Sequence, residues 1–189
     1  MQTEIYNIDY TQFTYVLGTT HFSKRSLREA HSAVAQINPT DLAIELDMKR
    51  YQLLNNDCAT CPNRESCTRK CEFIAAVDAL QNRDTNIWLI DMSRSQFWQR
   101  MHAIPAGSSH WRVLLHERDT LMAARLAWIA TSSLEKGETP RILALVGAAH
   151  VKGIESLLQN PFHLREKLRR LELPFTPPVL IRRVMISGD

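Results

Sequence analysis

Four short β-rich segments alternate along this chain with segments of helical periodicity, and this alternation limits the folds open to it. Each β-rich segment is apolar and is followed directly by a glycine or an aspartate; the segments are 13–17, 42–46, 87–90 and 142–146. Strands that alternate with helices predict an α/β fold, in which helices cover a layered, mixed sheet whose central strands are largely parallel. In such sheets ligands bind at the carboxyl ends of the strands, so the residues after each strand are the candidates for function.

Several helices are predicted between and after these strands. Ser26, with Glu29 three residues later, forms a capping box that opens a helix, and Asn38-Pro39 ends it. Further helices are predicted over 49–54, 73–80, 109–134 and 154–158. The apolar side of the longest helix is predicted to carry Trp111, Leu114, Leu115, Leu121, Met122, Leu126 and Ile129. The β-branched tail 179–186 is predicted to add a strand.

The composition fits one globular domain over 1–189. The sequence has 189 residues, of which 44% are hydrophobic and 23% are charged, which is enough for a single core. The net charge is only +3 and no basic stripe occurs, which argues against nucleic acid as a partner. Because neither a signal peptide nor a transmembrane run is visible, we expect a soluble, cytoplasmic protein. The oligomeric state is left open, a homodimer included.

A Gly-x-x-His motif occurs twice, each time directly after a predicted strand. Residues 18–21 read Gly-Thr-Thr-His and residues 147–150 read Gly-Ala-Ala-His. Glycine permits a sharp turn and a close approach to a ligand, and the motif then presents His21 or His150 at the carboxyl end of a strand. Imidazole is the commonest metal ligand and the commonest general base in proteins. One copy alone would be explained by a turn glycine and an incidental histidine, but two copies in the same context favour a site.

Glu45 is a carboxylate inside an otherwise apolar segment, 43–46. Burial of such a charge is costly unless the carboxylate is paired or binds a metal. The alternatives are a strand-edge residue that faces water and a salt bridge to Arg50. Its position near a strand end, like that of the two histidines, favours a functional role.

Glu117 and Arg118 interrupt the apolar stripe of the predicted 109–134 helix. Both lie three or four residues from Leu114 and from Leu121, which belong to that stripe. Charges on a core-facing stripe are rare unless they pair with each other or line a cavity. The sequence therefore offers two explanations, a catalytic pair and a structural Glu–Arg pair that braces the sheet.

Taken in order, these motifs resemble the TraB domain family of pheromone-shutdown (TraB/PrgY-type) proteins, which is similar to the Tiki-type metalloproteases. The matching stretches are VLGTTHFS (16–23), AIELDMKR (43–50), ERDTLMA (117–123) and LVGAAHVKG (145–153). Residues 72–91 also resemble a helix and strand of the family, so the resemblance covers most of 13–160. It implies an α/β fold with His21, His150, Glu45 and Glu117 around a divalent-metal site.

The sequence departs from the family pattern in two respects. Family members often carry a hydrophobic membrane region after the domain, and no such run occurs in this sequence. The second departure is a cysteine-rich segment at 55–71, which we expect to form a small insertion on the surface between two helices.

All the cysteines of the chain lie in this segment, as Cys58, Cys61, Cys67 and Cys71. Thiolates so close together suit a single metal centre. Structural zinc usually takes paired knuckles that lie further apart, whereas compact runs of cysteine often bind iron–sulfur clusters. The spacing matches neither standard pattern; we favour an Fe–S cluster over zinc, with two local disulfides as the alternative.

The leading hypothesis is a metal-dependent hydrolase of the TraB/Tiki type that acts on a peptide or protein substrate. His21, His150 and either Glu45 or Glu117 would hold the divalent ion, with Mn, Co and Zn left open. The remaining glutamate would act as general base, and Arg118 would orient it or stabilise the oxyanion. The alternative is a non-catalytic peptide-binding or sensing module with a structural or redox metal centre.

Overall fold

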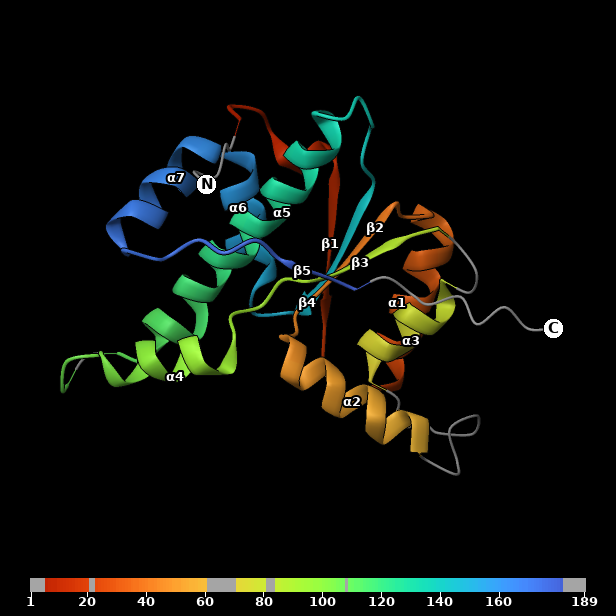
Figure 1. Cartoon of the computed structure of the whole chain (residues 1–189), viewed down its shortest axis with the longest axis horizontal. Helices are drawn as coiled ribbons and strands as arrows, with labels where there is room; N and C mark the ends of the chain where they lie inside the picture. The colour runs from red at the N-terminus through yellow and green to blue at the C-terminus, as the bar shows by residue number, and fades with distance from the viewer. Residues whose placement is uncertain (1–5, 21–22, 61–70, 81–83, 108, 182–189) are drawn as a thin grey trace.

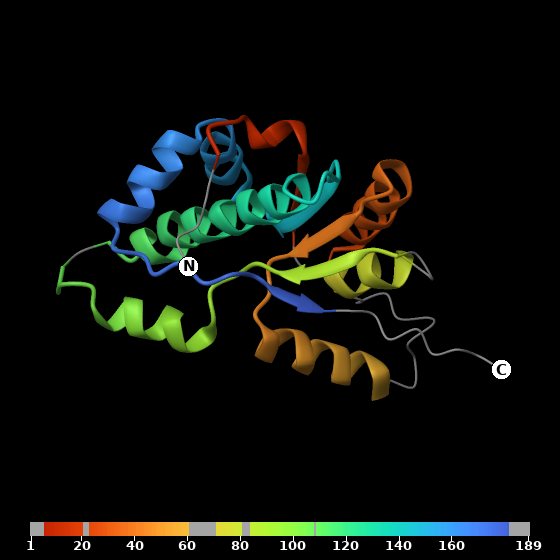
Figure 2. The ribbon, with the colours of Figure 1, turned by 45° about the horizontal axis from the view of Figure 1, so that its top comes forward.

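The protein is built on one mixed β-sheet, seen in a computed structural model that describes residues 6–20, 23–60, 71–80, 84–107 and 109–181. The strands are β1 (Thr14–Thr19), β2 (Asp41–Ile44), β3 (Asn86–Leu89), β4 (Ile142–Gly147) and β5 (Val179–Ile181). They lie in the order β1-β4-β2-β3-β5, with the first four parallel and β5 antiparallel to β3 at the edge (Figure 2). The predicted α/β fold with largely parallel central strands is confirmed.

Helices cover both faces of this sheet. They are α1 (Lys24–Ile37), α2 (Met48–Thr60), α3 (Glu72–Ala79), α4 (Arg94–His102), α5 (Arg118–Leu134), α6 (Val151–Gln159) and α7 (Pro161–Arg170), with a 3-10 turn η1 (Tyr10–Gln12) and a π-helical turn η2 (Arg112–Glu117). Figure 1 shows α1 and α3 on one face and α5, α6 and α7 on the other. None of the helices in the described part of the chain is long and apolar enough to span a membrane.

The two faces of the sheet carry side chains of different size. Along β4, Leu143 and Leu145 pack with α1 and α3, whereas Ala144 and Val146 pack with α5 and α6. This alternation follows from the period of two in a β-strand. On the second face, Ala43 and Ala144 of the sheet lie in one buried cluster with the alanines of α5.

Several element boundaries differ from the predicted ones. The N-cap of α1 is Ser23, whose Oγ accepts a hydrogen bond from Ser26 N, so the predicted capping box at Ser26 is wrong. Helix α2 continues to Thr60, six residues past the predicted end at 54, and it therefore includes the first part of the predicted cysteine-rich insertion. The predicted strand 179–186 is described only as far as Ile181, and the rest lies outside the described residues.

The predicted 109–134 helix is interrupted, and α4 is an unpredicted helix. The π-helical turn η2 precedes α5, and Trp111 is 61% exposed rather than on the apolar side. Helix α4 buries none of its residues, so it has no apolar stripe from which sequence periodicity could predict it.

We predict that Ala144→Leu destabilises the fold by about 1–3 kcal/mol, because a larger side chain between β4 and α5 overpacks this face. Ala144 is fully buried in the structure. For a chain of this length the expected fall in Tm is roughly 2–12 °C, measured by thermal unfolding. Ala35→Leu, on the exposed side of α1, is the matched control and should change the free energy of unfolding by less than about 0.5 kcal/mol. Equal Tm values for the two variants would contradict the close packing of α5.

Candidate active site at the strand ends

The candidate site lies where the chain paths leaving β2 and β4 diverge. These strands are neighbours, yet the chain leaving β2 reaches α3 on one face of the sheet and the chain leaving β4 enters α6 on the other. Such a divergence opens a crevice at the carboxyl ends of the strands, the place where α/β proteins bind ligands. Glu45 follows β2 directly, and His150 lies three residues after the end of β4.

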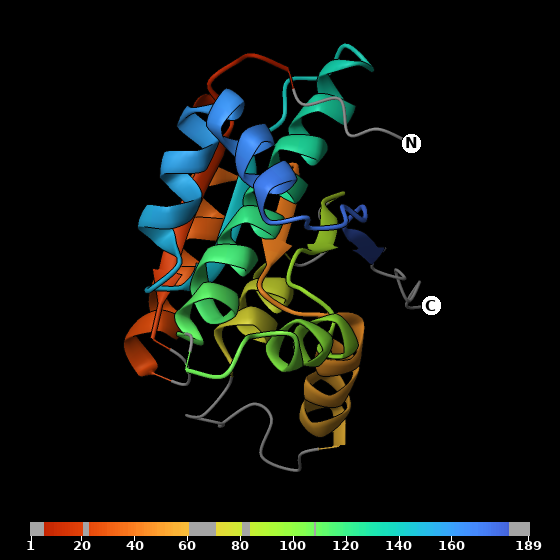
Figure 3. The ribbon, with the colours of Figure 1, turned by 90° about the vertical axis from the view of Figure 1, so that its left-hand side faces the viewer.

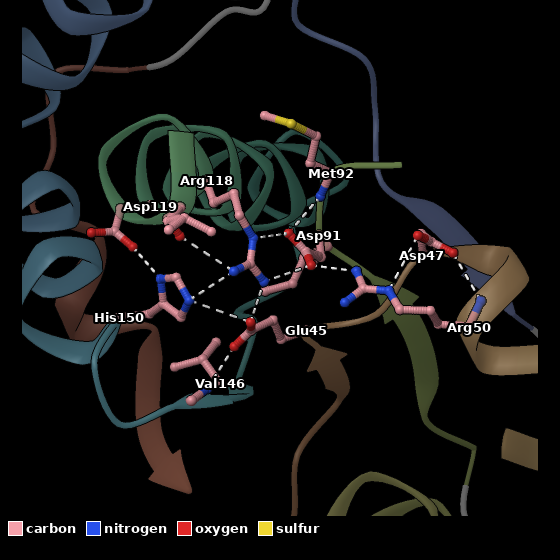
Figure 4. A network of polar contacts seen from close by, with 12 residues as sticks. Glu45, Asp47, Arg50, Asp91, Met92, Arg118, Asp119, Val146 and His150 are labelled. Carbon is pink, nitrogen blue, oxygen red and sulfur yellow. Dashed lines mark hydrogen bonds and ion pairs between the residues drawn. The ribbon is translucent and has the colours of Figure 1, made fainter. Parts of the chain in front are cut away.

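Glu45 is buried, at 5% exposure, and each of its carboxylate oxygens has a partner. Its backbone N–H continues the sheet ladder by donating to Leu145 O at 3.0 Å. Oε2 accepts a hydrogen bond of 2.6 Å from Gly147 N, and Oε1 accepts one from Arg118 Nη2 (Figure 4). The alternative interpretations of Glu45, a residue facing water or a partner of Arg50, are both wrong. The carboxylate is a buried charge that is paired, as its burial requires.

Arg118 joins this carboxylate to a second one, Asp91, at the end of β3. Its Nε and Nη2 donate to the two oxygens of Asp91 at 3.0 and 2.8 Å, a bidentate pair. Arg50 donates to Asp91 from the other side and to Asp47 at 3.2 Å. Burial alone would raise the pKa of Asp91, but the hydrogen bonds and charges of Arg118 and Arg50 outweigh it, so the pKa lies below its usual range. Asp91 thus contributes stability above pH 3.8 that is lost as the pH falls through the lowered pKa.

His150 is held by Asp119, and its contacts fix its tautomer. His150 Nδ1 lies 2.5 Å from Asp119 Oδ1, and Nε2 lies 3.2 Å from Arg118 Nη1. Because a guanidinium can only donate, Nε2 must accept from Arg118 and Nδ1–H must donate to Asp119. Nε2 therefore carries the lone pair, which accepts from Arg118, and Glu45 Oε1 lies 3.4 Å from the same nitrogen (Figure 4).

His150 Nε2 and Glu45 Oε1 both accept from the guanidinium of Arg118, and their separation is also close to that of two ligands of one metal ion. Two donor atoms that are each about 2.0–2.1 Å from a tetrahedral zinc lie about 3.3 Å apart, and the observed distance is 3.4 Å. The Asp119–His150 contact is also the outer hydrogen bond that a ligating histidine usually makes. In the described ranges no three His, Cys, Asp or Glu residues form a group that could hold a metal. His21, the predicted third ligand, lies outside the described residues.

Glu117, predicted as a ligand or a base, has other partners in the structure. Its oxygens accept from Arg100 Nε and Nη2 at 2.6 and 2.8 Å and from Arg112 Nε at 3.0 Å. The side chain is 1% exposed, so the carboxylate is fully enclosed by these cations. The contacts favour the structural-pair explanation for Glu117, although its partners are Arg100 and Arg112 and not the adjacent Arg118.

The predicted cysteine centre is described only in part. Cys61 and Cys67 lie outside the described residues, and Cys58 lies in the last turn of α2. Cys71 is the N-cap residue of α3 and is buried at 5% exposure in the core between this helix and the sheet. The position of Cys71 therefore differs from the surface position expected for the insertion, and a shared metal centre stays a prediction.

Two site residues, Asp91 and Asp119, were not among the predicted ones. The sequence signal for Asp91 is its place directly after a strand, the same signal that selected Glu45 and the histidines. Asp119 belongs to the Glu-Arg-Asp triplet at 117–119, in which only the first two residues were selected. Their burial, at 3% and 5% exposure, comes from long-range partners that no local pattern reveals.

Gly18, in the first Gly-x-x-His motif, and Gly153, three residues after the second, allow neighbouring side chains to approach the backbone closely and do not form turns. Gly18 lies within β1, and a Cβ there would come within 2.6 Å of Val151 Cγ2. Gly153 lies in α6, and a Cβ there would come within 2.1 Å of Asp119 Oδ2. The expected sharp turn at Gly18 is thus replaced by an extended strand whose missing side chain lets α6 pack against it.

We predict that Glu117→Gln destabilises the protein by about 2 kcal/mol, or roughly 4–8 °C in Tm, because two arginines lose their buried counter-charge. Thermal and urea unfolding measure the effect. Glu29→Gln breaks the exposed pair with Arg25 and is the matched control, with an expected change below about 0.5 kcal/mol. A Glu117→Gln protein that keeps its Tm but loses metal affinity would instead restore Glu117 as a ligand.

We also predict that Gly153→Ala lowers Tm, although alanine inside a helix normally stabilises by about 1 kcal/mol relative to glycine. The added Cβ displaces Asp119, and with it the hydrogen bond to His150. Ser156→Ala, at an exposed position of the same helix, is the control and should not lower Tm. In an Asp119→Ala background the Gly153 substitution should become neutral or stabilising; a rise in Tm in the wild-type background would contradict the contact.

Comparison with known proteins assigns neither a family nor a function to this chain. No family model, no curated protein and no solved structure matches the chain. The resemblance to TraB domains therefore stays a prediction that depends on the four short motifs. Function has to be inferred from Glu45, Arg118, Asp119 and His150 as the fold arranges them.

Proposed function

We propose that the protein is a hydrolase of peptide bonds, as the resemblance to the TraB/Tiki proteins led us to expect. Its active site would lie at the carboxyl ends of β2 and β4. One observation carries the proposal: His150, oriented by Asp119, lies with Nε2 3.4 Å from Glu45 Oε1, and Arg118 contacts both. These residues come from three distant parts of the chain. Their convergence at a strand-end crevice is typical of a catalytic centre.

Asp119 and His150 supply the proton-accepting part of this centre. Asp119 holds the imidazole in the tautomer that leaves Nε2 free of a proton. This nitrogen accepts from Arg118 in the structure, and it would accept a proton from water or bind a cation once that contact is exchanged. Both side chains are almost fully buried, at 5% exposure each. Their orientation is therefore fixed before substrate arrives, which reduces the reorganisation that the reaction requires.

Arg118 supplies the charge-stabilising part. Asp91 holds its guanidinium through two hydrogen bonds, while its Nη1 and Nη2 reach His150 and Glu45. Attack of water on a peptide carbonyl creates a negative oxygen, and a positioned guanidinium beside it lowers the barrier. The low exposure of the side chain, 14%, strengthens this interaction because little water screens it.

The metal-dependent form of the proposal assigns His150, Glu45 and His21 as ligands of Mn, Co or Zn. Such an ion would lower the pKa of a bound water to about 7 and so supply a nucleophile at neutral pH. The distance of 3.4 Å between His150 Nε2 and Glu45 Oε1 supports this form. An Fe–S cluster or zinc at Cys58, Cys61, Cys67 and Cys71 and a cytoplasmic location also remain part of the proposal.

We predict that His150→Gln and Glu45→Gln each lower the rate of peptide hydrolysis at least about 100-fold, because each removes a proton acceptor or ligand from the centre. The full chain, stripped of metal and then supplied with Mn, Co or Zn, is incubated with a peptide library and the products are identified by mass spectrometry. His163→Gln, at an exposed position of α7, is the matched control and should keep the wild-type rate.

The same experiment separates the two function classes. Wild-type protein that binds peptides but cleaves none with any of the metals would support the non-catalytic binding module. Cleavage that survives in both variants would place the hydrolytic centre elsewhere in the chain. Circular dichroism of each variant shows whether a loss of rate reflects unfolding.

A further inference from the structure

A groove lies beside Arg118, between the start of α2 and α4. Figure 3 shows these two helices next to each other at one end of the sheet. The groove consists of a cavity of about 280 Å³ next to Arg118 and an adjoining one of about 450 Å³, and Asp47, Arg94 and Trp98 line both. We call this combined space the α2–α4 groove. Arg118 lines its inner end, so a ligand in the groove reaches the catalytic network.

Some charged side chains along the groove are paired with one another, and others are not. Asp91 and Arg118 at the inner end, and Arg50 with Asp47, are already paired with one another. Arg94, at the start of α4, forms no ion pair with any residue in the described part of the chain, and the same holds for Lys49 at the start of α2. The outer part of the groove therefore offers two cations to an anionic ligand.

The wall of the groove is apolar and partly aromatic. Trp98 is 48% exposed, and its ring packs edge-on against Phe97 with centroids 5.5 Å apart. Leu114 and Met92 complete the wall near Arg118. An apolar group that enters the inner cavity would cover this aromatic surface and gain the free energy of its burial.

We propose that the α2–α4 groove binds the C-terminal residue of a peptide substrate, with its α-carboxylate at Arg94 and Lys49 and its apolar side chain against Trp98 and Phe97. A monoanion fits better than a phosphate dianion, because Asp47 and Asp91 also line the groove and repel excess negative charge. This assignment rests on the proposed function, which it deepens.

With the carboxylate so placed, the peptide bond next to the C-terminal residue lies toward Arg118, which contacts Glu45 and His150. Hydrolysis adds one water across this C–N bond: the hydroxyl goes to the carbonyl carbon and the proton to the nitrogen. The products are a shortened peptide with a new carboxylate and a free apolar amino acid. The protein would thus act as a carboxypeptidase with a preference for apolar C-terminal residues.

Binding of N-acetyl-leucine to the full chain, measured by calorimetry, tests the assignment without any turnover. We expect its Kd to be at least about tenfold lower than that of N-acetyl-leucinamide, which lacks the negative charge. Arg94→Gln should raise the Kd of N-acetyl-leucine about tenfold, whereas Arg25→Gln, an exposed arginine on α1, should leave it unchanged. Trp98→Ala should also weaken binding, through the lost apolar contact.

Two comparisons make the result decisive. His150→Gln should abolish hydrolysis but keep the Kd of N-acetyl-leucine, so a failure of catalysis is distinguishable from a failure of the groove. The free acid 4-methylpentanoate has the same carboxylate and alkyl group but no amide; binding as tight as that of N-acetyl-leucine would assign the groove to small acids and overturn the peptide assignment. Equal Kd values for N-acetyl-leucine and its amide, or no effect of Arg94→Gln, would overturn it as well.

Discussion

The guanidinium of Arg118 is the group around which this end of the molecule is organised. It lies between Glu45 at the end of β2 and Asp91 at the end of β3, and it also reaches His150 beyond the end of β4. The carboxylates of two adjacent strand ends would repel each other strongly in a buried environment without this cation. Burial lowers the pKa of Arg118, but the hydrogen bonds and charges of Asp91 and Glu45 outweigh it and raise the pKa above its ordinary value, so the cation is permanent. The polar side chains that follow β2, β3 and β4 can therefore lie together because α5 places the guanidinium of Arg118 between them.

The local form of the helix explains how one short stretch serves so many partners. Glu117 ends the π-helical turn η2, and Arg118 begins α5. Successive residues of a helix point in directions about 100° apart. Glu117 can therefore bind Arg100 and Arg112, Arg118 can bind Asp91 and Glu45, and Asp119 can bind His150. A π-helical turn frequently marks a functional site, since it shifts the side chains that follow it relative to the earlier turn.

Sequence reasoning predicted the parts of the structure that depend on local chemistry. The four parallel strands follow from short apolar segments, and Glu45 and His150 from the rule that function lies after strand ends. It did not predict α4, whose residues are all at least partly exposed and show no apolar period. It also treated Glu117 and Arg118 as a pair with each other. In the structure Glu117 binds Arg100, 17 positions away, and Arg112, five positions away, whereas Arg118 binds the distant Glu45. Pairing of buried charges is decided by the tertiary arrangement, and a motif records only that the charges are present.

The charges buried around the site leave it negative, which bears on what it can bind. Glu45, Asp47, Asp91 and Asp119 are carboxylates within one connected network, and the cations that touch them are Arg50 and Arg118. Arg125 adds a third positive charge by donating to the carbonyl oxygens of Ile90 and Asp91, but burial lowers its pKa to about 10. The excess of carboxylates over guanidinium groups lies on the side of His150, because Asp119 contacts His150 and neither Arg50 nor Arg118. An added cation beside Asp119 would balance the network, whereas on the opposite side Arg94 and Lys49 have no carboxylate partner in the described part of the chain.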